Sequence, residues 1–483
     1  MNAPTKPVNL STRALPDLSL LEISAVIARG AATPLEVTEA VLARVDALDP
    51  KLSAYIAVSR AHALEAAETA TRERAQGLDR GPLHGVPLAL KDLCETDFAP
   101  TSAGLALLRG HETGRNATVT ARLQQAGAVI LGKLGMTEGA YSGHHPDMPV
   151  PKNPWNPACW AGSSSSGSGV SVAAGLCFGA TGSDTGGSIR FPSASCGITG
   201  MKGTWGRVSR HGVFALADSL DHVGPMARTA ADCAAMLTAM AGADPADPTA
   251  LTAPVPDYLA ACAGPIRGVR IGLDRAAVLE AAAPETAAVL SDALSALEAL
   301  GAEIVPIAFP WPGDSTEQWS VLCAIEVALA HAGRFPEQRA GYGPQLTSLL
   351  DFGLGLGAKD VGAALQWRLV YNGMVARAMA GVDMVILPVT AAPLPEIDNP
   401  YGAPSAGPSN ENLGDLLKFT APADFTGYPA LTLPGGFDGR GAPIGFQLMG
   451  KALSEPLLFQ VGAAFQRMTD WHTRRPDLAP FQS

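Results

Sequence analysis

Apolar residues recur at helical or strand spacing along much of the chain, separated by stretches rich in glycine and proline. Two sequences of the form S/T-x-x-E, Ser19–Glu22 and Thr33–Glu36, predict helix N-termini, and Pro34 suits the first position of the second helix. The apolar face of that helix is predicted to stop at Pro50. Further amphipathic or alanine-rich segments predict helices over 60–76, 118–126, 230–242 and 284–300.

Short apolar runs between these helices predict buried strands. They cover 54–58, 86–90, 128–133, 269–273, 302–307 and 382–388. Strand, helix and strand alternate over 86–133 and again over 269–307, which is typical of an α/β fold. We therefore expect a single large α/β/α layered domain, with a central mixed, mostly parallel twisted sheet covered by helices.

Composition limits the classes of partner. The 483 residues are 47% hydrophobic and 16% charged, which is ample for a large core, and the formal net charge of -11 argues against nucleic-acid binding through phosphates. The N-terminal stretch lacks a signal-peptide pattern, and no apolar run reaches membrane-spanning length, so we expect a cytoplasmic protein without a membrane partner. The abundance of alanine and glycine is compatible with a homodimer.

Seven cysteines are scattered singly, at Cys94, Cys159, Cys177, Cys196, Cys233, Cys262 and Cys323. Their odd number and the lack of a C-x-x-C pair argue against a disulfide framework or a structural zinc site. His144, His145 and Asp147 lie close together in a proline-rich loop. Adjacent histidines do not converge naturally on one ion, so we interpret this loop as a border of a substrate entrance and predict no metal.

The most informative stretch runs from Ala161 to Arg190. It holds four consecutive serines (163–166) within a glycine-rich loop, then an apolar segment, then a second glycine-rich turn that contains Ser188. A flexible linker is the ordinary interpretation of a serine–glycine run. Two small-residue loops that bracket one buried segment indicate instead two backbone turns that meet at one site, where glycines allow close approach to a ligand and serines supply hydroxyl groups.

These two loops, their spacing and the Ser-Ile-Arg-x-Pro ending at Pro192 resemble the signature of the amidase signature family of serine hydrolases. The resemblance extends from about Leu20 to the C-terminal segment, where Gly427–Leu431 and Pro443–Leu448 also match. Asp424 departs from the family, which often has Asn there. The resemblance implies one domain over 1–483, divided into an N-terminal helical segment (18–76), a catalytic core (77–242) and a C-terminal part (265–483) that completes the sheet and the substrate pocket.

The family resemblance also implies the roles of individual residues. Ser188 is expected to be the nucleophile, Ser164 the relay serine that follows a cis peptide bond after Ser163, and Lys91 the base at the end of a buried strand. The expected oxyanion hole is formed by Thr185, Gly186, Gly187 and Ser188. Asp184, Arg190 and Ser165 are expected to support the site structurally. The chemistry requires no cofactor, because a lysine made neutral by burial can act as the base.

The expected activity is hydrolysis of the C–N bond of a carboxamide through an acyl-enzyme, on a small aryl or alkyl amide, and also on carbamates or esters. The alternative is the glutaminase component of a tRNA-dependent amidotransferase, although Phe191 stands where that component usually has a polar residue. A non-catalytic scaffold is a third interpretation, which the presence of Lys91, Ser164 and Ser188 disfavours.

Overall fold

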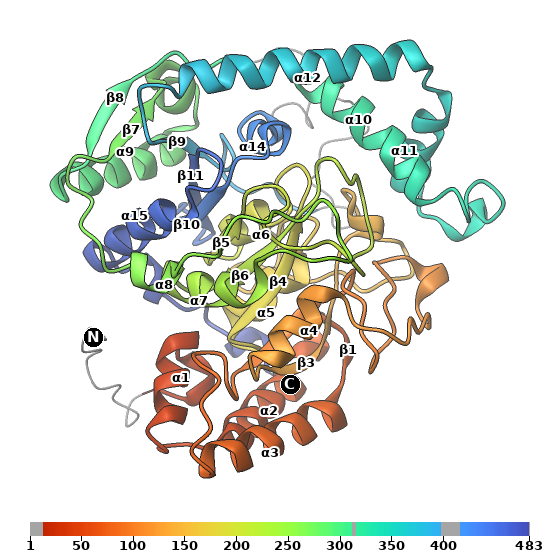
Figure 1. Ribbon diagram of the computed structural model, residues 1–483, viewed down its shortest axis with the longest axis vertical. Helices are drawn as coiled ribbons and strands as arrows, with labels where there is room; N and C mark the ends of the chain where they lie inside the picture. Colours follow the sequence, from red (N-terminus) through yellow and green to blue (C-terminus); the bar gives the residue numbers. More distant parts are fainter. Residues whose placement is uncertain (1–12, 312–314, 398–415, 483) are drawn as a thin grey trace.

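The computed structural model describes residues 13–311, 315–397 and 416–482. Its single domain is built on one 11-stranded sheet with helices on both faces (Figure 1). The strands are β1 Tyr55–Val58, β2 Pro87–Lys91, β3 Val129–Leu134, β4 Gly179–Asp184, β5 Thr199–Lys202, β6 His222–Ala227, β7 Arg270–Leu273, β8 Glu303–Pro306, β9 Met384–Pro388, β10 Ala430–Phe437 and β11 Pro443–Gly450.

The helices differ greatly in length. They are α1 Leu20–Ala28, α2 Pro34–Leu52, α3 Arg60–Ala75, α4 Thr118–Gln125, α5 Ser166–Ala174, α6 Arg190–Ser195, α7 Ala230–Met240, α8 Tyr258–Ala261, α9 Pro284–Ala299, α10 Ser315–Ala330, α11 Pro344–Gly355, α12 Ala358–Ala378, α14 Ala421–Thr426 and α15 Glu455–Met468. Figure 1 shows α1–α3 grouped at one end of the molecule and α10–α12 at the other.

Helix starts follow the sequence closely. Both predicted capping boxes are present, at Ser19 with Glu22 and at Thr33 with Glu36. The end of α2 was predicted wrongly, because the helix continues through Pro50 to Leu52 and is capped by Ser53 in a left-handed conformation. A proline is tolerated where only the last turn follows it, since few backbone hydrogen bonds are then lost.

The sheet is mixed, as predicted, but it is not mostly parallel. Its order is β1-β3-β2-β4-β6-β5-β10-β11-β9-β7-β8. Of the ten pairings between described strands, four are parallel (β2–β3, β2–β4, β7–β8 and β7–β9) and six are antiparallel. The parallel pairs lie toward the two ends, where strands and helices alternate. In the centre, β5–β6 and β10–β11 are joined without a helical crossover, so the chain reverses direction.

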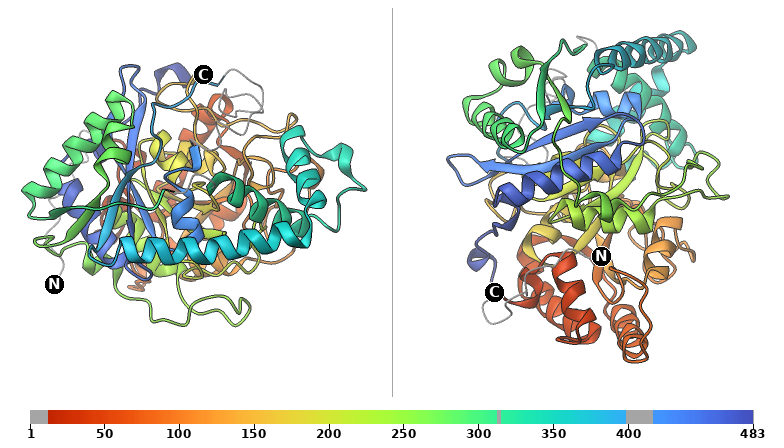
Figure 2. Two further views of the ribbon diagram at one scale, coloured as in Figure 1. Left: turned by 90° about the horizontal axis from the view of Figure 1, so that it is seen from above. Right: turned by 60° about the vertical axis from the view of Figure 1, so that its left-hand side comes forward.

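Each face of the central sheet carries its own helical layer (Figure 2). Helix α15 contacts α7 and α9 on one face, and all three helices contact strands of the sheet there. On the other face, α5 and α6 contact each other, and α6 lies against β5, β10 and β11. A Cβ at Gly200 of β5 would lie 2.1 Å from Ser193, and one at Gly445 of β11 would lie 2.8 Å from Ala194. Strand glycines therefore let the short helix α6 approach the sheet closely.

The remaining sequence predictions have mixed outcomes. The seven cysteines are unpaired and buried. No described helix is both long enough and apolar enough to cross a membrane. The stretch 391–413 is rich in proline, glycine and asparagine, which predicts a loop that shapes the substrate site, and most of it lies outside the described residues. The division into segments 18–76, 77–242 and 265–483 stays a prediction.

Candidate active site

Lys91 ends the buried strand β2, which lies between β3 and β4. Its backbone N–H donates to the Thr181 hydroxyl on β4 at 2.9 Å. Its side chain is completely buried, and Nζ lies 2.7 Å from both Ser164 Oγ and Ser183 Oγ. The strand thus delivers an amine to two hydroxyl groups from separate segments of the chain.

The electrostatic environment of Lys91 favours the neutral amine. Among the described residues no carboxylate lies within ion-pair distance of Nζ. Burial lowers the pKa of Lys91 to about 7, although Cys94, Asp221 and Asp184 act in the opposite direction. Desolvation penalises the ammonium form, so a large fraction of this lysine is unprotonated near neutral pH.

The serine run forms the entry to α5. The Ser163–Ser164 peptide bond is cis, and the Ser164 carbonyl accepts a hydrogen bond from Thr137 N at 3.2 Å. Ser165 Oγ donates to the Ser183 carbonyl at 3.2 Å, and Ser165 N donates to the Ser188 carbonyl at 3.3 Å. Ser165 therefore joins the serine loop to the strand and turn that carry Ser188.

Ser188 lies in the turn between β4 and α6. It is partly exposed, whereas its neighbours in the chain from Gly182 to Ile189 are buried. Among the described residues, the Ser188 hydroxyl has no hydrogen-bond partner, while Ser164 Oγ is bonded to Lys91. The structure thus brings the Ser188 turn beside the serine loop and leaves the Ser188 hydroxyl open to an incoming molecule.

The turn before Ser188 has glycines for steric reasons. Gly187 has a φ of +134°, and a Cβ there would lie 2.4 Å from the Phe191 ring. A Cβ at Gly186 would lie 2.9 Å from Trp319, whose Nε1 donates to the Thr185 carbonyl at 2.9 Å. Neither close approach leaves room for a side chain.

Of the four turn residues expected to form the oxyanion hole, Gly187 has an amide that is already hydrogen-bonded. The Gly187 N–H donates to Asp184 Oδ1 at 2.7 Å, so it is already occupied by a carboxylate. In the described part of the chain, the amides of Thr185, Gly186 and Ser188 have no acceptor. The expectation that Gly187 donates to an oxyanion does not fit this geometry, because sequence spacing does not reveal which way a carboxylate points.

Asp184 and Arg190 fix the conformation of the turn through hydrogen bonds and an ion pair. Asp184 accepts hydrogen bonds from the Gly187 and Ile189 amides and pairs with the Arg190 guanidinium. Burial alone would raise the pKa of the Asp184 carboxyl, but the adjacent Arg190 outweighs it and holds that pKa below its ordinary value. Charge-assisted bonds of this kind are shorter and stronger than neutral ones.

Arg190 also connects the turn to the C-terminal part of the chain. Its Nη1 donates to the Thr420 carbonyl at 2.7 Å and to Gln447 Oε1 at 3.0 Å, and Nη2 lies 2.7 Å from Asp424 Oδ2. The Thr420 hydroxyl donates to the Gly186 carbonyl. Burial raises the pKa of Asp424 well above its ordinary value, against the effect of Arg190.

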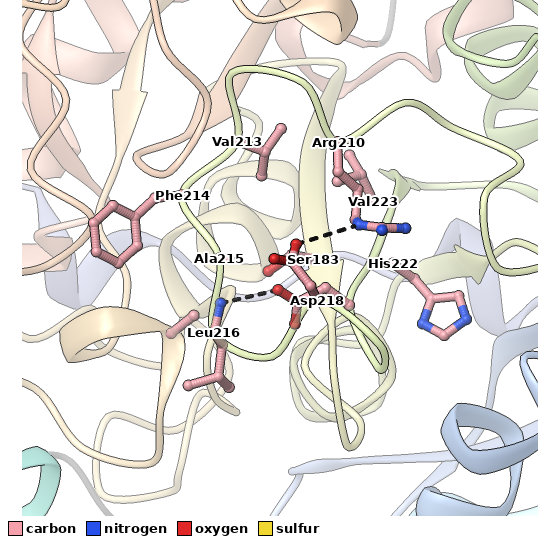
Figure 3. A pocket seen from close by; sticks show the side chains of 11 residues that line it. Ser183, Arg210, Val213, Phe214, Ala215, Leu216, Asp218, His222 and Val223 are labelled. Carbon is pink, nitrogen blue, oxygen red and sulfur yellow. Dashed lines mark hydrogen bonds and ion pairs between the residues drawn. The ribbon is translucent and has the colours of Figure 1, made fainter. Parts of the chain in front are cut away.

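A small cavity lies next to Ser183, between this residue, the loop that precedes β6 and the start of β6 (Figure 3). Its volume of about 10 Å³ suits about one water molecule. Asp221 lines it, accepts from the Thr185 hydroxyl at 2.5 Å, and has its pKa raised to about 6 by burial. This cavity borders the lysine site but is too small for an amide substrate.

Sequence reasoning missed several residues that complete this geometry. Ser183 is the second hydroxyl on Lys91, Thr137 bonds the Ser164 carbonyl, Trp319 covers the glycine turn, and Asp221 holds Thr185. Ser183 lies on β4 five positions before Ser188, a usable clue once the strand is known. Thr137, Trp319 and Asp221 come from distant segments and carry no local signal.

The histidine loop is engaged in hydrogen bonds. His144 Nε2 lies 3.1 Å from Ser166 Oγ, and His145 Nδ1 accepts from Asp147 N at 3.0 Å. Within the residues that the structure describes, no group of three or more His, Cys, Asp or Glu side chains is arranged to hold a metal. The loop thus lies beside the serine run, and its role as a border of the substrate entrance stays a prediction.

Comparison with known proteins gives consistent matches over nearly the whole chain. The family model described as Amidase matches residues 36–459. A relative named "Putative amidase AmiD" in Mycobacterium tuberculosis is 43% identical over 470 residues, covering 97% of this chain and 98% of the relative. A Glutamyl-tRNA(Gln) amidotransferase subunit of Roseiflexus sp. is 39% identical over 490 residues, covering 96% of this chain and 99% of that relative.

Among solved structures, the native peptide amidase from Stenotrophomonas maltophilia aligns with a TM-score of 0.83 and 32% sequence identity. The alignment covers 96% of this chain and 99% of that enzyme. The similarity therefore includes both the helical N-terminal region and the C-terminal strands, in addition to the loops that carry the serines.

Proposed function

Because the chain belongs to the amidase signature family and is an amide-hydrolysing enzyme, we propose that it cleaves carboxamides with a Ser188–Ser164–Lys91 triad. The observation that carries the proposal is the buried Lys91 amine, which lies 2.7 Å from Ser164 Oγ and has no carboxylate partner among the described residues. Its pKa of about 7 suits a general base at neutral pH. A serine hydroxyl needs such a base before it becomes an effective nucleophile.

In the proposed reaction, Ser188 Oγ forms a bond to the substrate carbonyl carbon. Its proton passes to Ser164 as the Ser164 proton passes to Lys91. The tetrahedral intermediate then breaks its C–N bond, and Lys91 returns the proton through Ser164 to the leaving nitrogen. Water hydrolyses the acyl-enzyme by the same relay in the opposite order, which releases the acid and restores Ser188.

We assign the oxyanion hole to the amides of Thr185, Gly186 and Ser188. Preorganised N–H donors stabilise the developing negative charge, and loss of one typically costs about 3–4 kcal/mol. In this proposal Asp184 and Arg190 act by positioning, because Asp184 binds the Gly187 amide and Arg190 connects the turn to Thr420 and Gln447.

The surroundings of the turn support an apolar substrate group. Trp319 and Leu417 lie against Gly186, and Phe191 lies against Gly187. Phe191 in turn packs on Trp160, with ring centroids 5.6 Å apart. Aromatic side chains contribute large apolar contact areas, so we propose an aryl or alkyl amide, with carbamates and esters as further substrates.

The direct test is release of an aromatic amine from a chromogenic anilide at pH 8, comparing the wild-type protein with Lys91→Ala. We expect turnover by the wild type and a loss of at least about 10³-fold in the variant, because general acid–base catalysis contributes up to about 10⁴-fold. Near-normal activity of a folded Lys91→Ala protein would refute the triad.

The similarity to the Roseiflexus amidotransferase component favours one second candidate, the glutaminase of a tRNA-dependent amidotransferase. A serine-reactive phosphonate labels Ser188 in either case, so labelling does not separate the two activities. Ammonia release from glutamine does, because a glutaminase of this kind would act only after its partner proteins are added. Anilide hydrolysis by the isolated chain, with no ammonia from glutamine, supports the independent amidase.

We also propose that the protein is located in the cytoplasm and forms a homodimer. The seven buried, unpaired cysteines support a reducing compartment. Light scattering coupled to size-exclusion chromatography tests the dimer, which would have about twice the chain mass of 49.6 kDa.

A further inference from the structure

A second cleft, which we call the arginine cleft, lies at the far end of α5 from the serine loop. It has a volume of about 510 Å³, and its walls include Arg13, Asp17, Arg44, Thr473, Arg475 and Gln482. The last residues of α5, Ala173 and Ala174, also line it. Because α5 rises 1.5 Å per residue, this wall lies about 12 Å along the helix from Ser166.

Arginines outnumber acids around the cleft. Arg13 pairs with Glu22, and Arg44 pairs with Asp17 at 2.5 Å. Within the described part of the chain, Arg475 donates only to main-chain carbonyls, those of His472, Arg474 and Asp17. Among the described residues it has no carboxylate partner, so its charge is not neutralised by an ion pair.

A fourth guanidinium lies behind the wall. Arg228 is buried and donates to the carbonyls of Leu18 and Pro16. Burial lowers its pKa, and repulsion from Arg475 and Arg44 lowers it further. Burial likewise lowers the pKa of Arg475 to about 10, with repulsion from Arg13 as the next cause.

The local charge balance is therefore positive in a protein with a net charge of -11. A third carboxyl group nearby, Asp232, caps α7 and has its pKa raised to about 6 by burial. Even with Asp232 ionised, the cleft region has four guanidinium groups and only three carboxylates. They are Arg13, Arg44, Arg228 and Arg475, and Asp17, Glu22 and Asp232. The C-terminus of α5 adds about half a negative charge, which does not restore balance.

We propose that the arginine cleft binds a small molecule through its phosphate or carboxylate groups. Guanidinium groups recognise both kinds of oxyanion through paired N–H donors, and the Gln482 amide on the wall supplies a further polar group. The volume lies within the range of about 300–1,000 Å³ that is usual for small-molecule sites. Bound oxyanion would supply the negative charge that Arg475 lacks.

Binding would also tie three separate segments together. Arg13 and Asp17 precede α1, Arg44 belongs to α2, and Arg475 belongs to the C-terminal tail. A ligand that binds only the folded state stabilises it in proportion to the logarithm of its concentration over Kd. We therefore expect phosphate or a tricarboxylate to raise the unfolding temperature beyond the effect of ionic strength alone.

The test is calorimetric titration of the full chain with inorganic phosphate and, separately, with citrate, at an ionic strength held constant with sodium chloride. We expect saturable binding of at least one anion and an accompanying rise in Tm. The preferred anion distinguishes a phosphate ligand from a carboxylate ligand. No saturable binding of either anion would overturn the proposal.

Matched variants locate the site. Arg475→Gln should weaken binding by at least about tenfold, which corresponds to about 1.4 kcal/mol, whereas Arg474→Gln should not change it, because Arg474 is half exposed, lies outside the cleft and pairs with Asp470. Arg13→Gln, at the partly exposed rim, provides a second cleft variant if Arg475→Gln does not fold. Equal affinity in the cleft variants and in Arg474→Gln would overturn the proposal. The measurement does not depend on amide hydrolysis.

Discussion

Two completely buried lysines on neighbouring strands illustrate how partners decide the role of one residue type. Lys91 ends β2, and Lys133 lies on β3, where Leu90 and Lys133 are directly paired. Lys133 Nζ lies 3.1 Å from Asp92 Oδ1 and 2.7 Å from the Thr101 hydroxyl. The hydrogen bonds of Lys91 Nζ to other described residues go only to hydroxyl groups. A carboxylate stabilises the ammonium form, whereas hydroxyl groups in a buried site leave the amine able to accept a proton.

The largest expected effect is on activity in Lys91→Met. We expect anilide hydrolysis to fall by at least about 10³-fold, because the proposed base is removed. The same variant should have a higher Tm at pH 7. Since the pKa of Lys91 is depressed to about 7 in the folded state, the unfolded chain binds more protons between pH 7 and about 10. The buried lysine therefore lowers the stability of the folded state increasingly as the pH falls through this range, and most strongly below it. A lower Tm would contradict this account.

Lys133→Met should have the opposite profile. It leaves the buried Asp92 carboxyl without its cation, and breaking such a pair typically costs about 3–5 kcal/mol. Urea denaturation followed by circular dichroism measures the loss. A double variant, Lys133→Met with Asp92→Leu, removes both charges and should recover much of the stability. If Lys133→Met is as stable as the wild type, the ion pair does not have the role inferred here.

The pH dependence of kcat/KM tests the protonation state directly. Lys91 must be neutral to accept a proton, so kcat/KM should rise about tenfold per pH unit below pH 7 and level off above it. Burial causes this depressed pKa, so a plateau reached only near the ordinary lysine pKa of about 10.4 would show that the amine is hydrated.

Ser183→Ala should lower kcat/KM by about tenfold, a smaller effect than that of Lys91→Met. The Ser183 hydroxyl accepts one hydrogen bond from Lys91 Nζ, and a bond to a charged group contributes about 1.5–3 kcal/mol. Its removal should shift the acidic limb of the pH profile to lower pH, because the ammonium form loses an acceptor. Ser183→Thr retains the hydroxyl and serves as the control. A purely structural role would lower Tm without moving the pH profile.

Asp424→Asn should have the smallest effect, less than about threefold on kcat/KM. Burial raises the pKa of Asp424 well above its ordinary value, which favours the protonated carboxyl, and the Asn amide is the neutral replacement for that form. The Asn carbonyl oxygen still accepts from Arg190 Nη2. A loss of about 100-fold in steady-state assays would show that Asp424 is ionised and that Arg190 requires both carboxylates.

The sequence determined the elements that depend on local patterns. Capping residues, glycines and apolar runs located four helices and six strands to within one or two residues at each end, because these signals act over a few positions, whereas β4, β5, β6, β10 and β11 were not predicted. They also placed Lys91 at a strand end and Ser188 in a turn. The predicted stop at Pro50 failed, since one proline in a last turn costs little when the helix is packed.

Only the tertiary structure decided which strands pair and which side chains meet. The antiparallel centre of the sheet follows from connections between β5 and β6 and between β10 and β11, which no local period encodes. Asp221 and Trp319 reach the Ser188 turn across large sequence separations, Ser183 meets Lys91 from a different strand, and the Gly187 amide is directed to Asp184 rather than to a substrate. Burial, which lowers the pKa of Lys91, is a property of the whole packed molecule, and so the sequence could propose Lys91 as the base but could not establish how completely it is buried.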